Sequence, residues 1–109
     1  MENNLDPNND LTTIVFEPSS VTVTGQKNQT VSGSSIIKNI GTTRFTCRSV
    51  AKSCGCTTPS GIDTGTIIEP GESKELFFSI ELSSPADKFI YVHGNCTTIS
   101  LRIIKQITA

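Results

Sequence analysis

From Thr12 onward the chain contains several stretches in which apolar residues recur at every second position, with polar residues between them. This is the period of a β-strand with one buried face, and no stretch has the longer period of a helix. In residues 73–82 one face carries Leu76, Phe78, Ile80 and Leu82. The other stretches that we predict to be strands are residues 12–18, 19–25, 29–39 (which we expect Gly33 to break), 44–52, 87–95 and 97–107.

Segments rich in Pro, Gly, Asn and Ser separate these stretches and predict turns. Pro70-Gly71 suits the central pair of a type II turn, because proline fixes φ and glycine accepts a positive φ. About seven short strands in about 100 residues are typical of an immunoglobulin-like antiparallel β-sandwich. We therefore predict an all-β domain of this class over residues 12–109. Residues 1–11, rich in Asn and Asp, are predicted to form a flexible N-terminal arm.

Composition and charge exclude several classes of function. Charged residues make up 17% of the chain and the net charge is −1, so the basic surface that attracts nucleic acid phosphates is absent. No apolar stretch is long enough to span a bilayer, and the N-terminus lacks the basic and apolar segments of a secretion signal. We expect a protein that is made in the cytosol and has protein partners.

The segment Ser53–Thr57, with the sequence SCGCT, places Cys54 and Cys56 one residue apart directly after a predicted strand. We interpret it as a tight corner in which Gly55 supplies an unusual backbone conformation and both cysteines pack as small apolar side chains. A catalytic redox role has little support, since no helix follows and the spacing is not that of a C-x-x-C motif. A Cys54–Cys56 disulfide would close a very tight ring. A bridge to another cysteine or another chain is the remaining alternative.

Four side chains of the types that ligate zinc are present: Cys54, Cys56, His93 and Cys96. The strands that hold them pair antiparallel in an Ig-like sheet, which puts His93 about nine residues, or roughly 30 Å, from Cys54. We therefore expect no metal and no other cofactor. His93 also lacks a Ser or Asp partner in a motif, and the carboxylates lie in turns or on solvent faces, so we expect no enzyme.

Cys47 and Cys96 lie near one end of the sandwich in the same pairing, so a disulfide between them is geometrically allowed. A free Cys47 packed beside Phe45 is the alternative. Because no secretion signal is present, free thiols are favoured for all four cysteines.

Three features together resemble a bacterial and phage family of unknown function: the turn at Asn39–Gly41, the SCGCT segment, and the Pro-Gly-Glu-Ser step at residues 70–73. The resemblance covers roughly residues 31–104, and the second and third features are specific as a pair. The family is similar to the Ig-like domains of the Hydin (ASH) and major sperm protein group. The resemblance implies an Ig-like β-sandwich and carries no established catalytic activity over to this chain; Cys47 and Cys96 are outside the family pattern.

From these observations we expect a non-catalytic structural or interaction protein that is a subunit of a larger assembly. A phage virion component, such as a capsid-decorating or neck/tail accessory protein, fits best, with residues 1–11 binding neighbouring subunits; a homo-oligomer is compatible. The alternative is a secreted or periplasmic bacterial surface module of Ig-like fold. Phe77 and one of two side-chain pairs must point away from the core; the two pairs are Phe89 with Tyr91, and Ile90 with Val92. These side chains form either a partner-binding surface or ordinary exposed apolar area.

Overall fold

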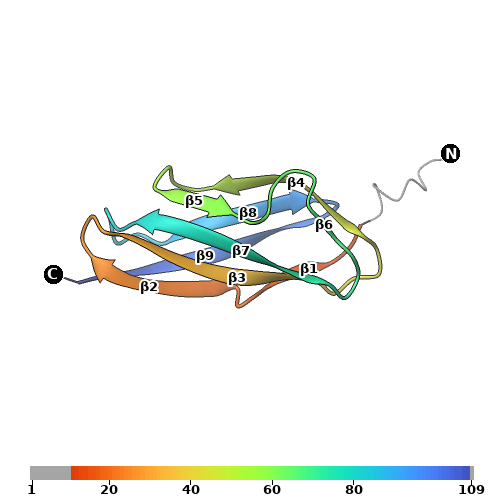
Figure 1. Cartoon of the computed structure of the whole chain (residues 1–109), viewed down its shortest axis with the longest axis horizontal. Coiled ribbons are helices and arrows are strands. Elements are labelled where there is room, and N and C mark those ends of the chain that lie inside the picture. The colour runs from red at the N-terminus through yellow and green to blue at the C-terminus, as the bar shows by residue number, and fades with distance from the viewer. Residues whose placement is uncertain (1–10, 109) are drawn as a thin grey trace.

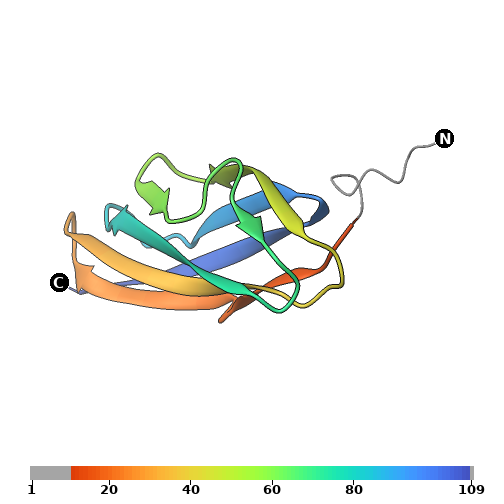
Figure 2. The ribbon, with the colours of Figure 1, turned by 45° about the vertical axis from the view of Figure 1, so that its right-hand side comes forward.

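Two β-sheets pack face to face in the computed structural model, which describes residues 11–108 (Figures 1 and 2). The four-stranded sheet has the order β1 (Ile14–Glu17), β3 (Thr30–Asn39), β7 (Ser73–Glu81) and β5 (Thr57–Ser60). The five-stranded sheet has the order β2 (Ser20–Gln26), β9 (Cys96–Thr108), β8 (Lys88–Gly94), β4 (Phe45–Lys52) and β6 (Ile67–Ile68). The described residues contain no helix that could span a membrane. The predicted all-β sandwich is confirmed.

All seven predicted strands are present, and the structure adds two that the pattern missed. These are β5, which contains Pro59, and β6, which is only two residues long. Both are too short to show an alternation, and β5 forms because Thr57 pairs with Ile80 of β7. Gly33 does not break β3, which corrects the prediction. A Cβ atom at this position would lie 2.6 Å from the ring of Phe78, so the glycine makes room for that ring.

The chain changes sheets between its first two strands. β1 pairs antiparallel with β3, whereas β2 pairs in parallel with β9. The change occurs at Pro18, whose peptide bond with Glu17 is cis. The Pro18 carbonyl accepts a hydrogen bond from the Ser35 hydroxyl of β3, so the crossing point is fixed to the first sheet.

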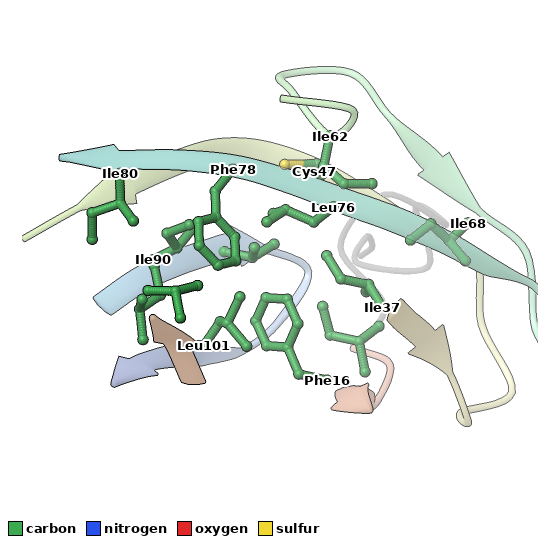
Figure 3. Close-up of a cluster of buried hydrophobic side chains, with 14 of the residues drawn as sticks. Phe16, Ile37, Cys47, Ile62, Ile68, Leu76, Phe78, Ile80, Ile90 and Leu101 are labelled. Carbon is green, nitrogen blue, oxygen red and sulfur yellow. The ribbon is translucent and has the colours of Figure 1, made fainter. Parts of the chain in front are cut away.

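The core lies between the two sheets (Figure 3). Most of its residues come from the predicted strands, and Ile62 and Ile68 add to it from outside them. The predicted face of β7 is fully buried, with Leu76, Ile80 and Leu82 at 0% exposure and Phe78 at 2%. From the facing sheet, β8 and β9 contribute Ile90, Val92, Leu101 and Ile103, all at 0%. Burial of such side chains stabilises the fold by about 1.5–3 kcal/mol each.

Asn39, at the end of β3, is fully buried and all four hydrogen-bonding positions of its amide are used. Its Oδ1 accepts from the Thr12 hydroxyl at 2.9 Å and from the Gly41 N–H at 3.0 Å. Its Nδ2 donates to the carbonyls of Thr43 and Ile68, each at 2.9 Å. One side chain therefore ties the segment before β1, the β3–β4 loop and β6 together.

The Pro70-Gly71 turn forms as predicted and is attached to the same asparagine. Gly71 has a φ of 84°, and the Glu72 N–H donates to the Glu69 carbonyl at 2.9 Å, as a type II turn requires. The Gly71 N–H in turn donates to the Asn39 carbonyl, and the Asn39 N–H donates to the Glu72 carbonyl. The turn thus closes the same end of the sandwich as the Asn39 side chain.

The predicted N-terminal arm falls almost entirely outside the described residues, which begin at Leu11. The predicted domain limits of 12–109 likewise extend one residue past the described part of the chain.

We predict that Asn39→Ala lowers the free energy of unfolding by about 3 kcal/mol or more, because the substitution leaves several buried donors and acceptors without partners. Denaturant unfolding of the full chain measures this value. The matched control is Gln106→Ala, which removes an exposed amide from β9 and should change stability by less than about 0.5 kcal/mol. Equal effects of the two substitutions would contradict the role assigned to Asn39.

Candidate protein-binding surface

Residues 53–56 connect the two sheets, since β4 belongs to the five-stranded sheet and β5 to the four-stranded one. Within this corner Cys54 and Cys56 form a disulfide, with Cα atoms 5.1 Å apart. The Thr57 N–H donates to the Cys54 carbonyl, and the Glu81 N–H donates to the Cys56 carbonyl at 3.0 Å. The corner is therefore attached by backbone hydrogen bonds to the end of β7.

The disulfide corrects our interpretation of the two cysteines as free, packed thiols. Cys56 does pack partly against the core, but its sulfur is bonded to that of Cys54. Gly55 does not have a positive φ, and a Cβ atom there would meet nothing within 4 Å. The corner thus does not need the special backbone conformation of glycine that we predicted. Its shape comes from the disulfide and from the bonds to β7.

Cys47 and Cys96 are free thiols in the structure, and both lie beside Gly94, which pairs with each of them. Burial is the main factor that raises the pKa of both thiols. For Cys96 the neighbouring Cys47 raises the pKa further. The predicted antiparallel pairing is correct and does bring these positions together. The disulfide that this pairing allowed is not formed in the structure, where both thiols are free.

The candidate zinc ligands are not gathered in one place. Two of them, Cys54 and Cys56, are bonded to each other, and His93 pairs with Ser49 in the middle of the sheet. The Nδ1 atom of His93 forms a hydrogen bond with the Thr98 hydroxyl at 3.0 Å. Within residues 11–108 no group of three or more His, Cys, Asp or Glu side chains could hold a metal ion.

The outward face of β8 carries a pair of partly exposed aromatic side chains. Of the two pairs considered, Ile90 and Val92 are buried in the core, so Phe89 and Tyr91 point outward. The two rings are stacked, with centroids 6.2 Å apart and an angle of 18° between their planes. Because two fully buried residues alternate with these rings, β8 holds them on a rigid base.

Residues of the two neighbouring strands border the aromatic pair on both sides. Arg102 of β9 lies opposite Phe89 and forms an ion pair with Asp87 at 2.6 Å. On the other side, Ala51 of β4 lies opposite Tyr91. We call the surface made by these five residues the aromatic face.

The corner and the aromatic face are directly connected. Ser53 donates its N–H to the Phe89 carbonyl at 3.0 Å, and its hydroxyl accepts the Phe89 N–H at 2.9 Å. This pair of hydrogen bonds extends the β4–β8 ladder into the SCGCT segment. No pattern in the sequence indicates this contact, since it depends on the register between two strands that are far apart in the chain.

Phe77 also points outward, as predicted, but it belongs to the opposite sheet and is 47% exposed. It pairs with Ser34 and Ser60 on the neighbouring strands, and Glu75 on the same face bonds to the Ser34 hydroxyl. Phe77 is thus a single ring in a polar setting, whereas Phe89 and Tyr91 form a continuous apolar surface.

Lys105 is a charged residue at a position where the alternation along β9 requires the side chain to point into the core. It follows Leu101 and Ile103 on the inward face of β9 and is 6% exposed. Its Nζ atom has no hydrogen-bond partner within the described part of the chain. Burial is the main cause of its lowered pKa; the nearby Lys88 lowers it further, and Asp87 raises it in part.

We predict that denatured, unreduced protein shows two reactive thiols and that both map to Cys47 and Cys96. In the folded protein, alkylation of these two should be slow and should accelerate only at a higher pH than for an exposed thiol, because burial raises both pKa values. Peptide mass mapping of alkylated protein over a pH series measures both quantities. Labelling of Cys54 or Cys56 before reduction would contradict the assignment.

Lys105→Met is predicted to stabilise the protein at neutral pH, because it removes a buried charge that has no partner. The folded-state pKa is lowered from 10.5, so between the two pKa values the unfolded chain binds more protons and stability rises with pH. Below the folded-state pKa, Lys105 is charged in the folded protein and the full cost of burying that charge remains. Unfolding free energies measured from neutral pH to about pH 10.5 should therefore rise less in Lys105→Met than in the wild type.

Lys74→Met is the matched control, since Lys74 is exposed on β7. It should leave the pH profile close to that of the wild type. A profile of Lys105→Met that parallels the wild type would show that Lys105 is not the source of the slope.

Comparison with solved structures gives the same fold at low sequence identity. A protein of unknown function from Porphyromonas gingivalis W83 matches with a TM-score of 0.73 and 14% identity, over 92% of this chain and 49% of that one. The chain thus spans about half the length of that protein. The ASH / PapD-like domain 7 of human CEP192 matches with a TM-score of 0.62 and 12% identity, over 99% and 92% of the two chains. Domains 4 and 5 of the S-layer protein SbsC match with a TM-score of 0.51 and 18% identity, over 88% and 52%.

These likenesses establish an Ig-like fold of the ASH/PapD type. Comparison with curated proteins gave no match. A family model matches residues 14–106, which include every strand except the last two residues of β9. The chain belongs to the family described as protein of unknown function (DUF1573).

Proposed function

We propose that the chain is a non-catalytic interaction module, a subunit of a larger assembly that binds a protein partner through the aromatic face. The observation that carries this proposal is the stacked pair of Phe89 and Tyr91 on the outside of the five-stranded sheet. Aromatic and arginine side chains contribute most of the binding energy in many protein interfaces. Arg102 lies beside the pair and provides the third group of this kind.

The rigidity of the face favours binding. Ile90 and Val92 anchor β8 in the core at 0% exposure, and Ser53 fixes its first residues through two hydrogen bonds. A surface that is ordered before it meets its partner loses less conformational entropy on binding. The ion pair between Arg102 and Asp87 similarly restrains the guanidinium group.

The cellular setting of the assembly is the finer part of the proposal, and two candidates stand. The first is a phage virion component, which was our expectation from the sequence; no comparison supports it. The second is a secreted or periplasmic surface module. The Cys54–Cys56 disulfide favours the second, because disulfides persist mainly in oxidising compartments.

Two of the similar structures belong to proteins that support the second setting. One is an S-layer protein. The other is the secreted serine protease VesC from Vibrio cholerae, which matches with a TM-score of 0.53 and 10% identity over 79% of this chain and 21% of that one. We therefore place the extracytoplasmic module ahead of the virion component as a proposal.

Site-specific photocrosslinking tests the role of the aromatic face. A photoreactive phenylalanine derivative in place of Tyr91 should form an adduct with one partner protein when the full chain is made in the organism that encodes it. The same group in place of Lys74, exposed on the opposite sheet, is the control and should form none. Phe89→Ala should weaken the identified complex at least about tenfold in Kd, as expected for a central aromatic contact.

Adducts from both positions in similar yield, or an unchanged Kd for Phe89→Ala, would contradict binding through this face. Cell fractionation of the same samples decides between the two settings, since a surface module is found outside the cytoplasmic membrane and a virion component with purified particles.

A further inference from the structure

The two sheets have four edge strands, and three of them carry features that hinder pairing with another strand. β1 is four residues long and ends at Pro18; β5 contains Pro59; β6 has two residues. Where β3 and β4 extend past their short neighbours, they carry Gly33 or the charged Arg48 and Lys52.

β2 is the edge that lacks all of these features. It has seven residues, Ser20–Gln26, with no proline and no charged side chain. It pairs with β9 over its full length, and no strand of residues 11–108 pairs with its other side. Figure 1 shows β2 along the rim of the sandwich. A regular, uncharged edge of this kind is a template for another strand.

The hydrogen bonds at both ends of β2 show which of its backbone groups face away from β9. The Ser19 carbonyl accepts from the Arg102 N–H at 3.0 Å, and the Gly25 carbonyl accepts from the Thr108 hydroxyl at 3.2 Å. Odd-numbered residues therefore face β9. Since the direction alternates along a strand, the N–H and C=O groups of Ser20, Thr22 and Thr24 face outward.

The sequence of β2 is nearly palindromic about Thr22. An antiparallel copy centred there places Val21 opposite Val23 and Ser20 opposite Thr24, so apolar residues meet apolar ones and hydroxyls meet hydroxyls. The same alignment makes Ser20, Thr22 and Thr24 the hydrogen-bonded positions, in agreement with the direction of their backbone groups. Cross-strand pairs of these types are favourable. A shift by two residues, which keeps the outward groups paired, would put Val21 opposite Gly25 in one direction and Val23 opposite Ser19 in the other.

We propose that β2 is a homotypic docking edge: two copies of this chain pair antiparallel through β2 about a two-fold axis at Thr22. The pairing joins the two five-stranded sheets into one continuous sheet. The contact area of a single strand pair is small, so the dimer is weak and depends on concentration. This inference is independent of the proposed function, because the aromatic face lies on β4, β8 and β9.

Sedimentation velocity of the full chain over a concentration series tests for the dimer. The wild type should shift from monomer to dimer as its concentration rises, and Thr22→Pro should remain a monomer. Proline removes an outward-facing N–H at this position and no bond to β9, so the variant should keep its fold, which circular dichroism checks. Tyr91→Ala should dimerise like the wild type. A wild type that stays monomeric up to its solubility limit would overturn the proposal, as would an unchanged dimer in folded Thr22→Pro.

Cysteine crosslinking tests the register. Oxidation of Thr22→Cys should yield a covalent dimer, because the two positions face each other across the axis. Thr24→Cys, whose partner position is Ser20, is the matched control and should yield several-fold less. Equal yields would overturn the proposed register.

Discussion

The amide of Asn39 is the constraint on which the closed end of the sandwich depends. It joins a segment before β1, the β3–β4 loop and β6 through four hydrogen bonds. Asn95 acts beside it: its side chain binds the backbone of Thr46 and Arg44, and its carbonyl accepts the Thr12 N–H. The two asparagine side chains thus provide hydrogen-bond partners for backbone groups of these loops that would otherwise be buried and unpaired. Both sheets are thereby held at one end, and their outer faces are left to make contacts.

The alternation of apolar residues was sufficient to predict seven strands and the buried face of β7, because a two-residue period has a direct structural meaning. The same rule predicts an inward-facing side chain at Lys105, which continues the series of Leu101 and Ile103 on β9. Its charge alone would assign it to the solvent-facing side instead. The position is buried because strand geometry, and not residue type, determines which way the side chain points.

Features that depend on register could not be predicted from the sequence. Alternation alone left it open whether Phe89 or Ile90 faced outward; the pairing of β8 with β9 decides this. β5 and β6 are too short to carry a periodic signal and exist because β7 and β4 offer open backbone groups beside them. Likewise, the bond between Cys54 and Cys56 required knowledge of how the corner folds onto β7.

The two sheets have unequal roles, and the change of sheet at Pro18 explains part of this difference. Had the first strand continued beside β3, it would have covered the edge of the four-stranded sheet and left β9 as an outer strand. Instead, the crossing shortens β1 and adds β2 to the side of β9. As a result, the sheet that carries the stacked aromatic pair also gains a regular, uncharged edge. The other sheet presents Phe77 among polar side chains and ends at proline-containing or very short strands. Surfaces suited to contact are therefore concentrated on one layer of the sandwich.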